Sequence, residues 1–350
     1  MDTIPPLIDQ YSHGAVHGEL GLGSFEAQLA AASGAHGPAP AGTSHFDSWT
    51  GLALRRWCPP LLGLEPHCTP ARDMARRREI GAYEAGRRLL RGAGIGTFLV
   101  ATGARSELTS AAELADAAGG RAHEVVRLEA LAEQVADTSG SVDAFIGYTA
   151  EAVYAAAQHA TAFASGAAHC DGRAPEAGEV RRAADRWLRG RRPGDRLTGP
   201  ALVRHLLWSA VATGRPVQLH GPDPGALEGF LRATTGLGAD LVLLPAALHH
   251  RRAAQLAAVH AHVYADAGPC PEETLRLAPF GKLLFSSGAH GLPELYVTGA
   301  RLFVRAMERL TREWVQEGMC PESEARRIVA LVGSGTARRV YRLPAGAPAD

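Results

Sequence analysis

Several short apolar runs of this sequence end on side chains that can transfer protons or bind a metal ion. Tyr11 and His13 follow the first run, His220 ends the fifth, Asp266 ends the seventh, and His290 follows the eighth. Histidine suits both kinds of chemistry because its imidazole titrates near neutral pH and is a frequent metal ligand. The pattern therefore indicates a site built from strand ends, provided that the runs are strands of one sheet.

The order of the predicted strands and helices indicates that these runs belong to one sheet. Eight runs are predicted to be strands, namely Leu7–Asp9, Thr97–Ala101, Glu124–Leu128, Ala160–Ala164, Pro216–His220, Asp240–Leu244, His262–Asp266 and Lys282–Ser286. Helical patterns separate them, near residues 143–158, 176–189, 199–213, 224–234, 250–258, 292–316 and 321–331. Alternating strands and helices imply a parallel sheet. Eight repeats predict an α/β fold that closes as a (β/α)8 TIM-like barrel, with an open doubly wound sheet as the alternative.

Local signals predict where two helices begin. Ser110 and Glu113 have the spacing of a capping box. Thr69, followed by proline, is predicted to open one long arginine-rich helix that ends near Gly92. The run Arg76-Arg77-Arg78 within it is expected to lie on a solvated helix face.

The chain is expected to form one domain over residues 1–342, followed by a frayed tail at 343–350. The stretch from Ser33 to Thr50 is rich in Gly, Ala, Pro and His, and it is predicted to be a long loop after the first strand.

The amino-acid composition disfavours some classes of binding partner. Lys plus Arg equals Asp plus Glu, 36 against 36, so no net field attracts nucleic acid or an anionic membrane. The 5 cysteines include no CxxC pair, which disfavours a disulfide framework and favours the reducing cytoplasm. No apolar run reaches the ~18 residues that a transmembrane helix needs. We therefore expect a cytoplasmic protein with a small-molecule substrate, no nucleic-acid or membrane partner, and a fold that often forms homo-oligomers.

Several segments also match a known family in the same order along the chain. They are Ile8-Asp9-Gln10-Tyr11-Ser12-His13-Gly14, Arg55-Arg56-Trp57-Cys58, Gly63-Leu64-Glu65-Pro66-His67, Gln218-Leu219-His220, Leu283-Leu284-Phe285-Ser286-Ser287, Gly291-Leu292-Pro293-Glu294 and Ala337-Arg338-Arg339-Val340-Tyr341. Together they resemble the amidohydrolase superfamily, and in particular its actinobacterial amidohydrolase-related proteins. The resemblance implies an amidohydrolase-type barrel with a catalytic metal at the strand ends.

The departures from the family pattern lie at the expected metal ligands. The positions of the missing ligands are occupied by Tyr11 in the first strand, Ala164 in the fourth, Pro245 in the sixth and Gly288 after the eighth. Only His13 and His220 remain as candidate metal ligands. A catalytic zinc normally needs three protein ligands and a water molecule. The resemblance therefore implies a degenerate metal site, with either one divalent metal, such as zinc, held by a rebuilt set of ligands or no metal.

The candidate site residues follow from both lines of argument. His13, His220, Tyr11 and His290 are the candidate catalytic residues, with Tyr11 as a donor that polarises a carbonyl group. Asp266, His169, His250 and Trp49 are the candidate binding residues. Each has a structural alternative, since loop histidines usually lie at the surface, a tryptophan can belong to the core, and an aspartate can hold a loop.

Two hypotheses of function remain open. The first is an amidohydrolase-like enzyme of specialised metabolism that acts on a small organic molecule at the carboxyl ends of the strands. It would hydrolyse a C–N bond, or carry out decarboxylation, another lyase step or cyclisation with histidine as acid and base. The second is a non-catalytic pseudoenzyme that binds a ligand or a partner protein.

Overall fold

The computed structural model describes residues 5–32, 34, 39–102, 107–166, 170–221, 223–269 and 271–344. His169 and residues 345–350 of the expected tail lie outside these ranges, as does part of the expected loop at 33–50.

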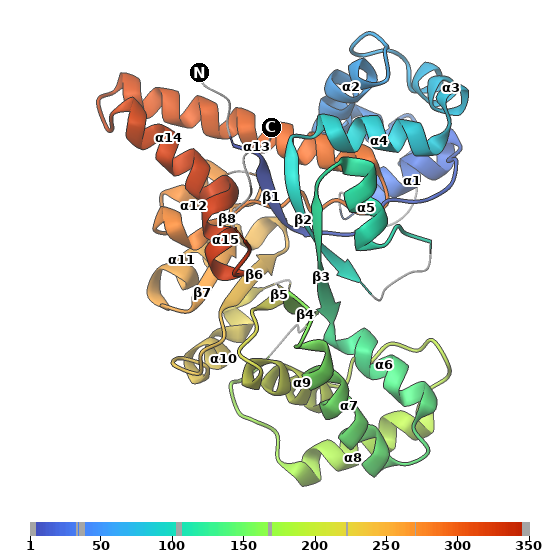
Figure 1. The fold of residues 1–350 in the computed structure, drawn as a ribbon, viewed down its shortest axis with the longest axis vertical. Helices are drawn as coiled ribbons and strands as arrows, with labels where there is room; N and C mark the ends of the chain where they lie inside the picture. Colours follow the sequence, from blue (N-terminus) through green and yellow to red (C-terminus); the bar gives the residue numbers. More distant parts are fainter. Residues whose placement is uncertain are drawn as a thin grey trace. The chain divides into compact units, whose positions relative to one another are not determined.

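Eight strands form one sheet in sequential order (Figure 1). They are β1 (Leu7–Ser12), β2 (Ile95–Thr102), β3 (Arg121–Arg127), β4 (Ala162–Ser165), β5 (Val217–Gly221), β6 (Leu241–Pro245), β7 (Val263–Asp266) and β8 (Leu283–Leu284). The strand order β1 to β8 and the parallel pairing confirm the predicted (β/α)8 barrel. A doubly wound sheet would reverse its strand order at a switch point, and this sheet has no such reversal.

The first strand pairs on both of its sides. On one side it pairs with β2 in parallel. On the other side it meets the segment that continues from β8, where Gln10 donates its backbone N–H to the carbonyl of Phe285 over 3.1 Å and His13 donates to Ala289 over 2.8 Å. The two ends of the sheet are therefore joined through β1.

Helices follow the strands as the pattern predicts. They are α1 (Leu22–Ala32), α2 (Trp49–Leu61), α3 (Pro70–Ile80), α4 (Ala82–Gly92), α5 (Ala111–Ala118), α6 (Leu128–Thr138), α7 (Val142–Ala156), α8 (Ala177–Gly190), α9 (Pro200–Ala212), α10 (Glu228–Ala233), α11 (His250–Val259), α12 (Pro271–Leu275), α13 (Pro293–Gln316), α14 (Glu322–Ala330) and α15 (Thr336–Val340).

The prediction of one long helix from Thr69 to Gly92 is wrong. The helix is broken at Gly81, whose φ of +83° lies in a region that only glycine enters easily. The start at Thr69 is confirmed, because its side chain accepts a hydrogen bond from the N–H of Arg72. The capping box at the start of α5 is also present, with Ser110 as its cap.

Internal contacts divide the chain into two compact units. One comprises residues 1–100, 105–123 and 285–334, and the other comprises residues 101–104, 124–284 and 335–350. The single domain over 1–342 stays a prediction.

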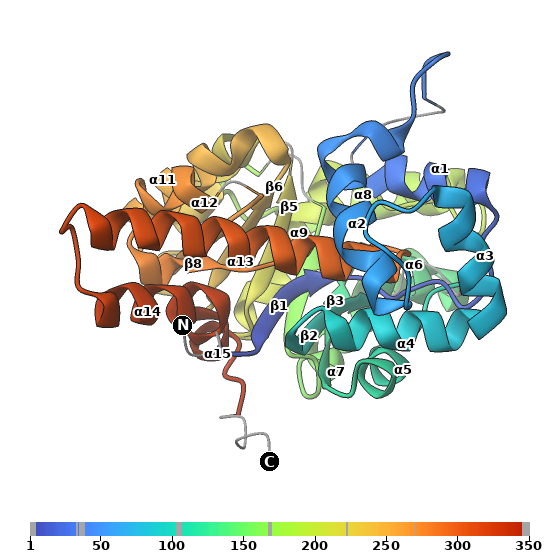
Figure 2. The same cartoon turned by 90° about the horizontal axis from the view of Figure 1, so that it is seen from above.

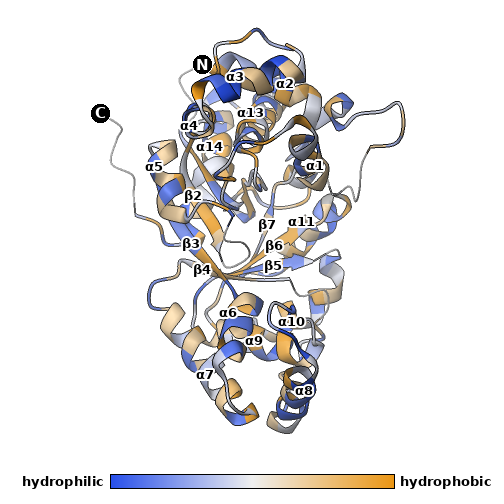
Figure 3. Ribbon diagram, turned by 90° about the vertical axis from the view of Figure 1, so that its right-hand side faces the viewer, coloured by the Kyte–Doolittle hydropathy of each residue, from blue (hydrophilic) through white to orange (hydrophobic). Residues whose placement is uncertain are grey.

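Each unit has its own buried aromatic residues. In the first unit, α2, α4 and α14 pack against α13 (Figure 2), and the rings of Phe98 and Tyr296 meet edge to face at 5.7 Å. In the second unit, the apolar strand β6 contrasts with the charged outer face of α8 (Figure 3), and Phe163 and Phe230 are fully buried. Among the described residues, no helix has the length and apolar character needed to cross a membrane.

Candidate functional site

The end of β1 places Tyr11 and His13 in contact. These residues are two apart, so an extended strand directs both side chains to the same face. The Tyr11 hydroxyl lies 2.7 Å from Nε2 of His13. In the tautomer that carries its proton on Nδ1, His13 accepts this hydrogen bond and the phenol donates it. The pair can therefore pass a proton between a phenol and an imidazole.

A second imidazole lies beside this pair. The ring of His290 is 4.9 Å from the ring of His13, centroid to centroid, in an edge-to-face arrangement. The backbone around it is bonded to the segment just after β1, because Gly291 donates its N–H to the carbonyl of Gly14 over 3.1 Å. The structure therefore brings together three of the four predicted catalytic residues, Tyr11, His13 and His290.

Two buried side chains, the carboxylate of Asp9 and the phenol of Tyr296, hold the backbone of the site in place. Asp9 has no exposed surface, and it accepts hydrogen bonds from both the N–H (2.8 Å) and the hydroxyl of Ser287. Tyr296 donates its hydroxyl to the carbonyl of His13. Burial, together with the negative charge of Asp9, raises the pKa of Tyr296 well above its ordinary value, which keeps the phenol a donor. These contacts fix the backbone at the end of β1.

The second unit holds three more of the predicted residues. His220 lies at the end of β5, partly buried. His250, the first residue of α11, has its Nε2 atom 3.4 Å from a carboxylate oxygen of Asp266 at the end of β7. A Cβ atom added at Gly268 would lie 2.3 Å from the His250 ring, so the loop packs closely on this imidazole. His250 and Asp266 thus form a histidine–carboxylate pair, and the expectation that His220 shares a pocket with His13 stays a prediction.

Of the other predicted residues, Trp49 is the first residue of α2 and 72% of its surface is exposed, so it does not belong to the core. Its role in a binding pocket stays a prediction, as does that of His169, which lies outside the described residues.

The donor atoms at the strand ends do not fit a catalytic zinc with three protein ligands. Ala164 lies in β4 just before its last residue, Ser165, and Pro245 ends β6, so the two positions at which the resemblance implies ligands carry no side-chain donor. Nε2 of His13 is engaged by the Tyr11 hydroxyl. Within the described ranges, no group of three or more His, Cys, Asp or Glu side chains is arranged to hold a metal ion. The metal role suggested for His13 and His220 stays a prediction.

Sequence reasoning missed a buried charged cluster, and its expectation for Arg77 is wrong. Arg77 is not on a solvated face: it is only 7% exposed, and it forms an ion pair with Glu294 of α13, whose side chain is fully buried. Asp73, one helical turn earlier, is 4% exposed. The signal was present in the sequence, because Met74 lies three residues before Arg77 and so marks the same face of α3 as the buried one.

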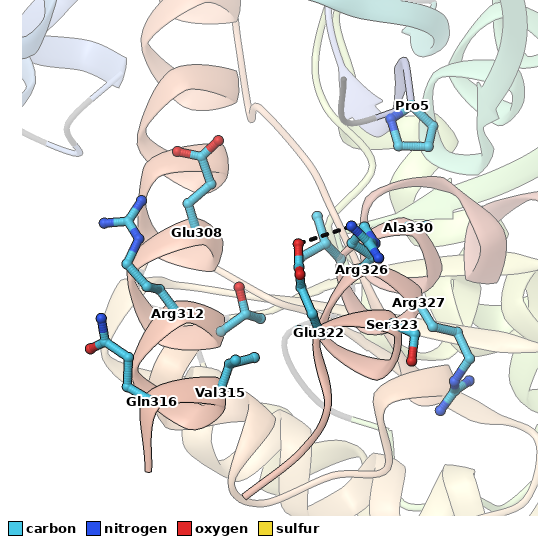
Figure 4. Close-up of a pocket in the computed structure, with 13 residues that line it drawn as sticks. Pro5, Glu308, Arg312, Val315, Gln316, Glu322, Ser323, Arg326, Arg327 and Ala330 are labelled. Carbon is cyan, nitrogen blue, oxygen red and sulfur yellow. Dashed lines mark hydrogen bonds and ion pairs between the residues drawn. The ribbon is translucent and has the colours of Figure 1, made fainter. Parts of the chain in front are cut away.

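A separate groove of about 500 Å³ lies between α13 and α14 (Figure 4). It is lined by apolar side chains such as Val315 and Val329 and by the ion pair of Glu322 with Arg326. None of the predicted site residues lines it.

Comparisons with known proteins agree on the fold. No family model and no curated protein matches the chain. Among solved structures, the chain is similar to a provisionally assigned metal-dependent hydrolase from Lactobacillus casei, with 21% identity, a TM-score of 0.80, and coverage of 97% of this chain and 96% of that one.

Uronate isomerases are more distant structural neighbours. The Thermotoga maritima enzyme has 14% identity and a TM-score of 0.64, with 96% of this chain and 94% of that one covered. The Bacillus halodurans enzyme has 13% identity and a TM-score of 0.62, with 97% and 94% covered. At these identities the likeness establishes the fold alone.

Proposed function

We propose that this chain is an amidohydrolase-like enzyme that acts on a small organic molecule by proton transfer through Tyr11 and His13. The single observation that carries the proposal is the 2.7 Å contact between the Tyr11 hydroxyl and Nε2 of His13. Its position supports the assignment, because (β/α)8 enzymes place their active sites at the carboxyl ends of the strands.

Tyr11 and His13 have different roles, because a phenol is a proton donor and an imidazole is a base at neutral pH. An unperturbed phenol, with a pKa near ~10, is protonated at neutral pH and can donate to a carbonyl oxygen of the substrate. An imidazole, with a pKa near ~6.5, can accept a proton at the same pH. When substrate is bound, the Tyr11 hydroxyl turns from Nε2 of His13 to the substrate oxygen and donates to it as negative charge develops there. Nε2 of His13 then accepts or returns the proton that the reaction moves. His290, beside the His13 ring, is the second imidazole available to exchange that proton.

Several reactions need this pairing of a donor and a base. Hydrolysis of an amide C–N bond places negative charge on the carbonyl oxygen, and decarboxylation of a β-keto acid places it on the ketone oxygen. Another lyase step or a cyclisation at a carbonyl group would use the donor and the base in the same way. The substrate is a small molecule in this proposal. A cytoplasmic location, a homo-oligomeric state and a role in specialised metabolism remain predictions from the sequence.

The test is the turnover of a panel of amides and carboxylic acids by the purified protein and its variants. Tyr11→Phe should lower kcat by about 10²- to 10⁴-fold, the usual contribution of a general acid or base, and His13→Asn should lower it similarly. Tyr83→Phe is the matched control, because Tyr83 is 65% exposed on α4 and its hydroxyl contacts only Asp116 among the described residues. Turnover by Tyr11→Phe at the wild-type rate would reject the assignment.

Metal content distinguishes this mechanism from a rebuilt metal centre. Stoichiometric zinc in the purified protein, lost in the His13→Ala/His220→Ala double variant, would replace the proposal with a metal-dependent mechanism. Turnover that is unchanged after dialysis against a chelator agrees with proton transfer through side chains.

A non-catalytic barrel is the second candidate. One observation favours it: Gly288 stands where the family places its catalytic aspartate, with a φ of +61° and no atom within 4 Å of where a Cβ would be. This position therefore offers open space and no functional group. A protein that turns over nothing in the panel, and that binds a small molecule equally well after the double substitution of His13 and His220, would favour this candidate.

A further inference from the structure

The charged cluster of Asp73, Arg77 and Glu294 (the α3–α13 cluster) is buried without being part of the strand-end site. The three residues are 4%, 7% and 0% exposed. Arg77 donates through Nη1 to Oε1 of Glu294 and also lies over the Phe25 ring of α1, at 5.5 Å from its centroid. The cluster therefore joins helices α1, α3 and α13 at one point.

The charges in the cluster do not balance unless a proton is present. Two carboxyl groups face one guanidinium, and a region of low polarity disfavours a second negative charge. Among the described residues, Oδ1 of Asp73 and Oε2 of Glu294 are both buried and have no hydrogen-bond partner. One proton on Asp73 would cancel the excess charge.

The two cysteines beside the cluster add no positive charge. Cys58 of α2 directs its thiol toward the carbonyl of Glu294 at 3.8 Å, and burial raises its pKa well above its ordinary value, so it stays neutral. Cys68, just before α3, also has its pKa raised, by burial and by the charge of Asp73. Burial, reinforced by Glu294 and opposed by Arg77, raises the pKa of Asp73 from 3.8 to about 7.

The cluster connects to the proposed site through the first turn of α13. Glu294 lies four residues after His290, and two residues later Tyr296 donates its hydroxyl to the carbonyl of His13. The backbone between them turns tightly, with the N–H of Leu292 bonded to the carbonyl of His290 at 2.9 Å. A shift of Glu294 would therefore move both imidazole-bearing segments.

We propose that Asp73, Arg77 and Glu294 are positioning residues, which fix the start of α13 and thereby the placement of His290 against His13, and that loss of a proton from the cluster loosens this placement. The catalytic importance of His13 and His290 depends on the proposed function. The coupling between the α3–α13 cluster and the segment that carries His290 does not depend on it.

The test monitors the backbone of the segment from Gly288 to Gly291, which contains His290, and it needs no substrate. The backbone amide signals of Gly288 and Gly291 are recorded by two-dimensional ¹H–¹⁵N NMR from pH 5.5 to 8.5. All proteins carry His13→Gln and His290→Gln, so that neither imidazole titrates beside the two glycines. The reference protein should show an inflection near pH 7 in both signals, and Asp73→Asn should abolish it. Arg78→Met is the control, because Arg78 is exposed on the same helix, and it should leave the inflection in place.

A second pair of variants tests the positioning by Arg77. Arg77→Met should displace both glycine signals at every pH, and Arg77→Lys, which retains a positive charge, should return them toward the reference positions. An inflection that persists in Asp73→Asn, or glycine signals that do not move in Arg77→Met, would overturn the inference. If the coupling is observed but Tyr11→Phe retains full turnover, the proposed function fails and the positioning cluster stands.

Discussion

The substitution Arg77→Met should destabilise the protein more than any other change of a single arginine on α3. It removes one member of a buried ion pair and leaves the carboxylate of Glu294, which has no exposed surface, without its partner. Breaking a buried pair in this way typically costs about 3–5 kcal/mol. Unfolding entropy of about 2.1 cal/mol/K per residue gives the 350-residue chain about 0.74 kcal/mol/K when it unfolds as one unit. The melting temperature should therefore fall by about 4–7 °C.

The assay is thermal unfolding followed by circular dichroism, with three comparisons. Arg78→Met, the exposed neighbour, should change the melting temperature by less than about 1 °C, as surface substitutions usually do. Arg77→Met/Glu294→Met removes both charges, and an apolar replacement of a buried pair is often neutral. The double variant should therefore regain at least about half of the loss.

Two results would refute this reasoning. Equal melting temperatures for Arg77→Met and Arg78→Met would mean that Arg77 is solvated after all. A double variant that is less stable than Arg77→Met alone would mean that the Glu294 side chain stabilises the fold by packing and hydrogen bonding, and not through its pairing with the guanidinium.

Three further predictions concern pH, packing and helix capping. The pKa of Asp73 is about 7 in the folded protein against an ordinary 3.8, so the stability it supports is present below about pH 4 and is lost as the pH rises to 7. Wild-type stability should fall by up to about 4 kcal/mol over this range relative to Asp73→Asn, as measured by urea unfolding at each pH. Gly268→Ala should be less stable than Gly236→Ala, because both residues have positive φ (+71° and +83°) but only the first would place a Cβ against the His250 ring; equal melting temperatures would contradict this. Ser110→Ala should cost about 0.5–2 kcal/mol through loss of its cap, and an unchanged urea midpoint would argue against the cap.

The sheet could be predicted because most strands contain a short apolar run bounded by polar or turn residues. Leu241–Pro245, for example, contains no polar side chain and was placed within one residue of its observed ends. The break between α3 and α4 was missed, because a glycine within a helical pattern is tolerated in many helices and its φ depends on tertiary packing.

The sequence predicted only the part of the site that lies at the end of a strand. Tyr11 and His13 could be paired from their spacing along β1, but the approach of His290 depends on how the residues after β8 pack on that strand. The burial of Arg77 was missed for a related reason. An arginine between two other arginines resembles a solvated run, and only the partner 217 residues away makes its burial favourable.

The pairing of β1 with the segment after β8 has a consequence for biosynthesis. Gln10 receives its partner Phe285 only after a further 275 residues have been made, since 285 minus 10 is 275. At about 5–20 residues per second, the ribosome needs roughly 14–55 s for that stretch. During this interval one edge of β1 is unsatisfied, and the nascent chain is open to strand addition by other chains. The group of Tyr11, His13 and His290 can therefore form only after most of the polypeptide has been made.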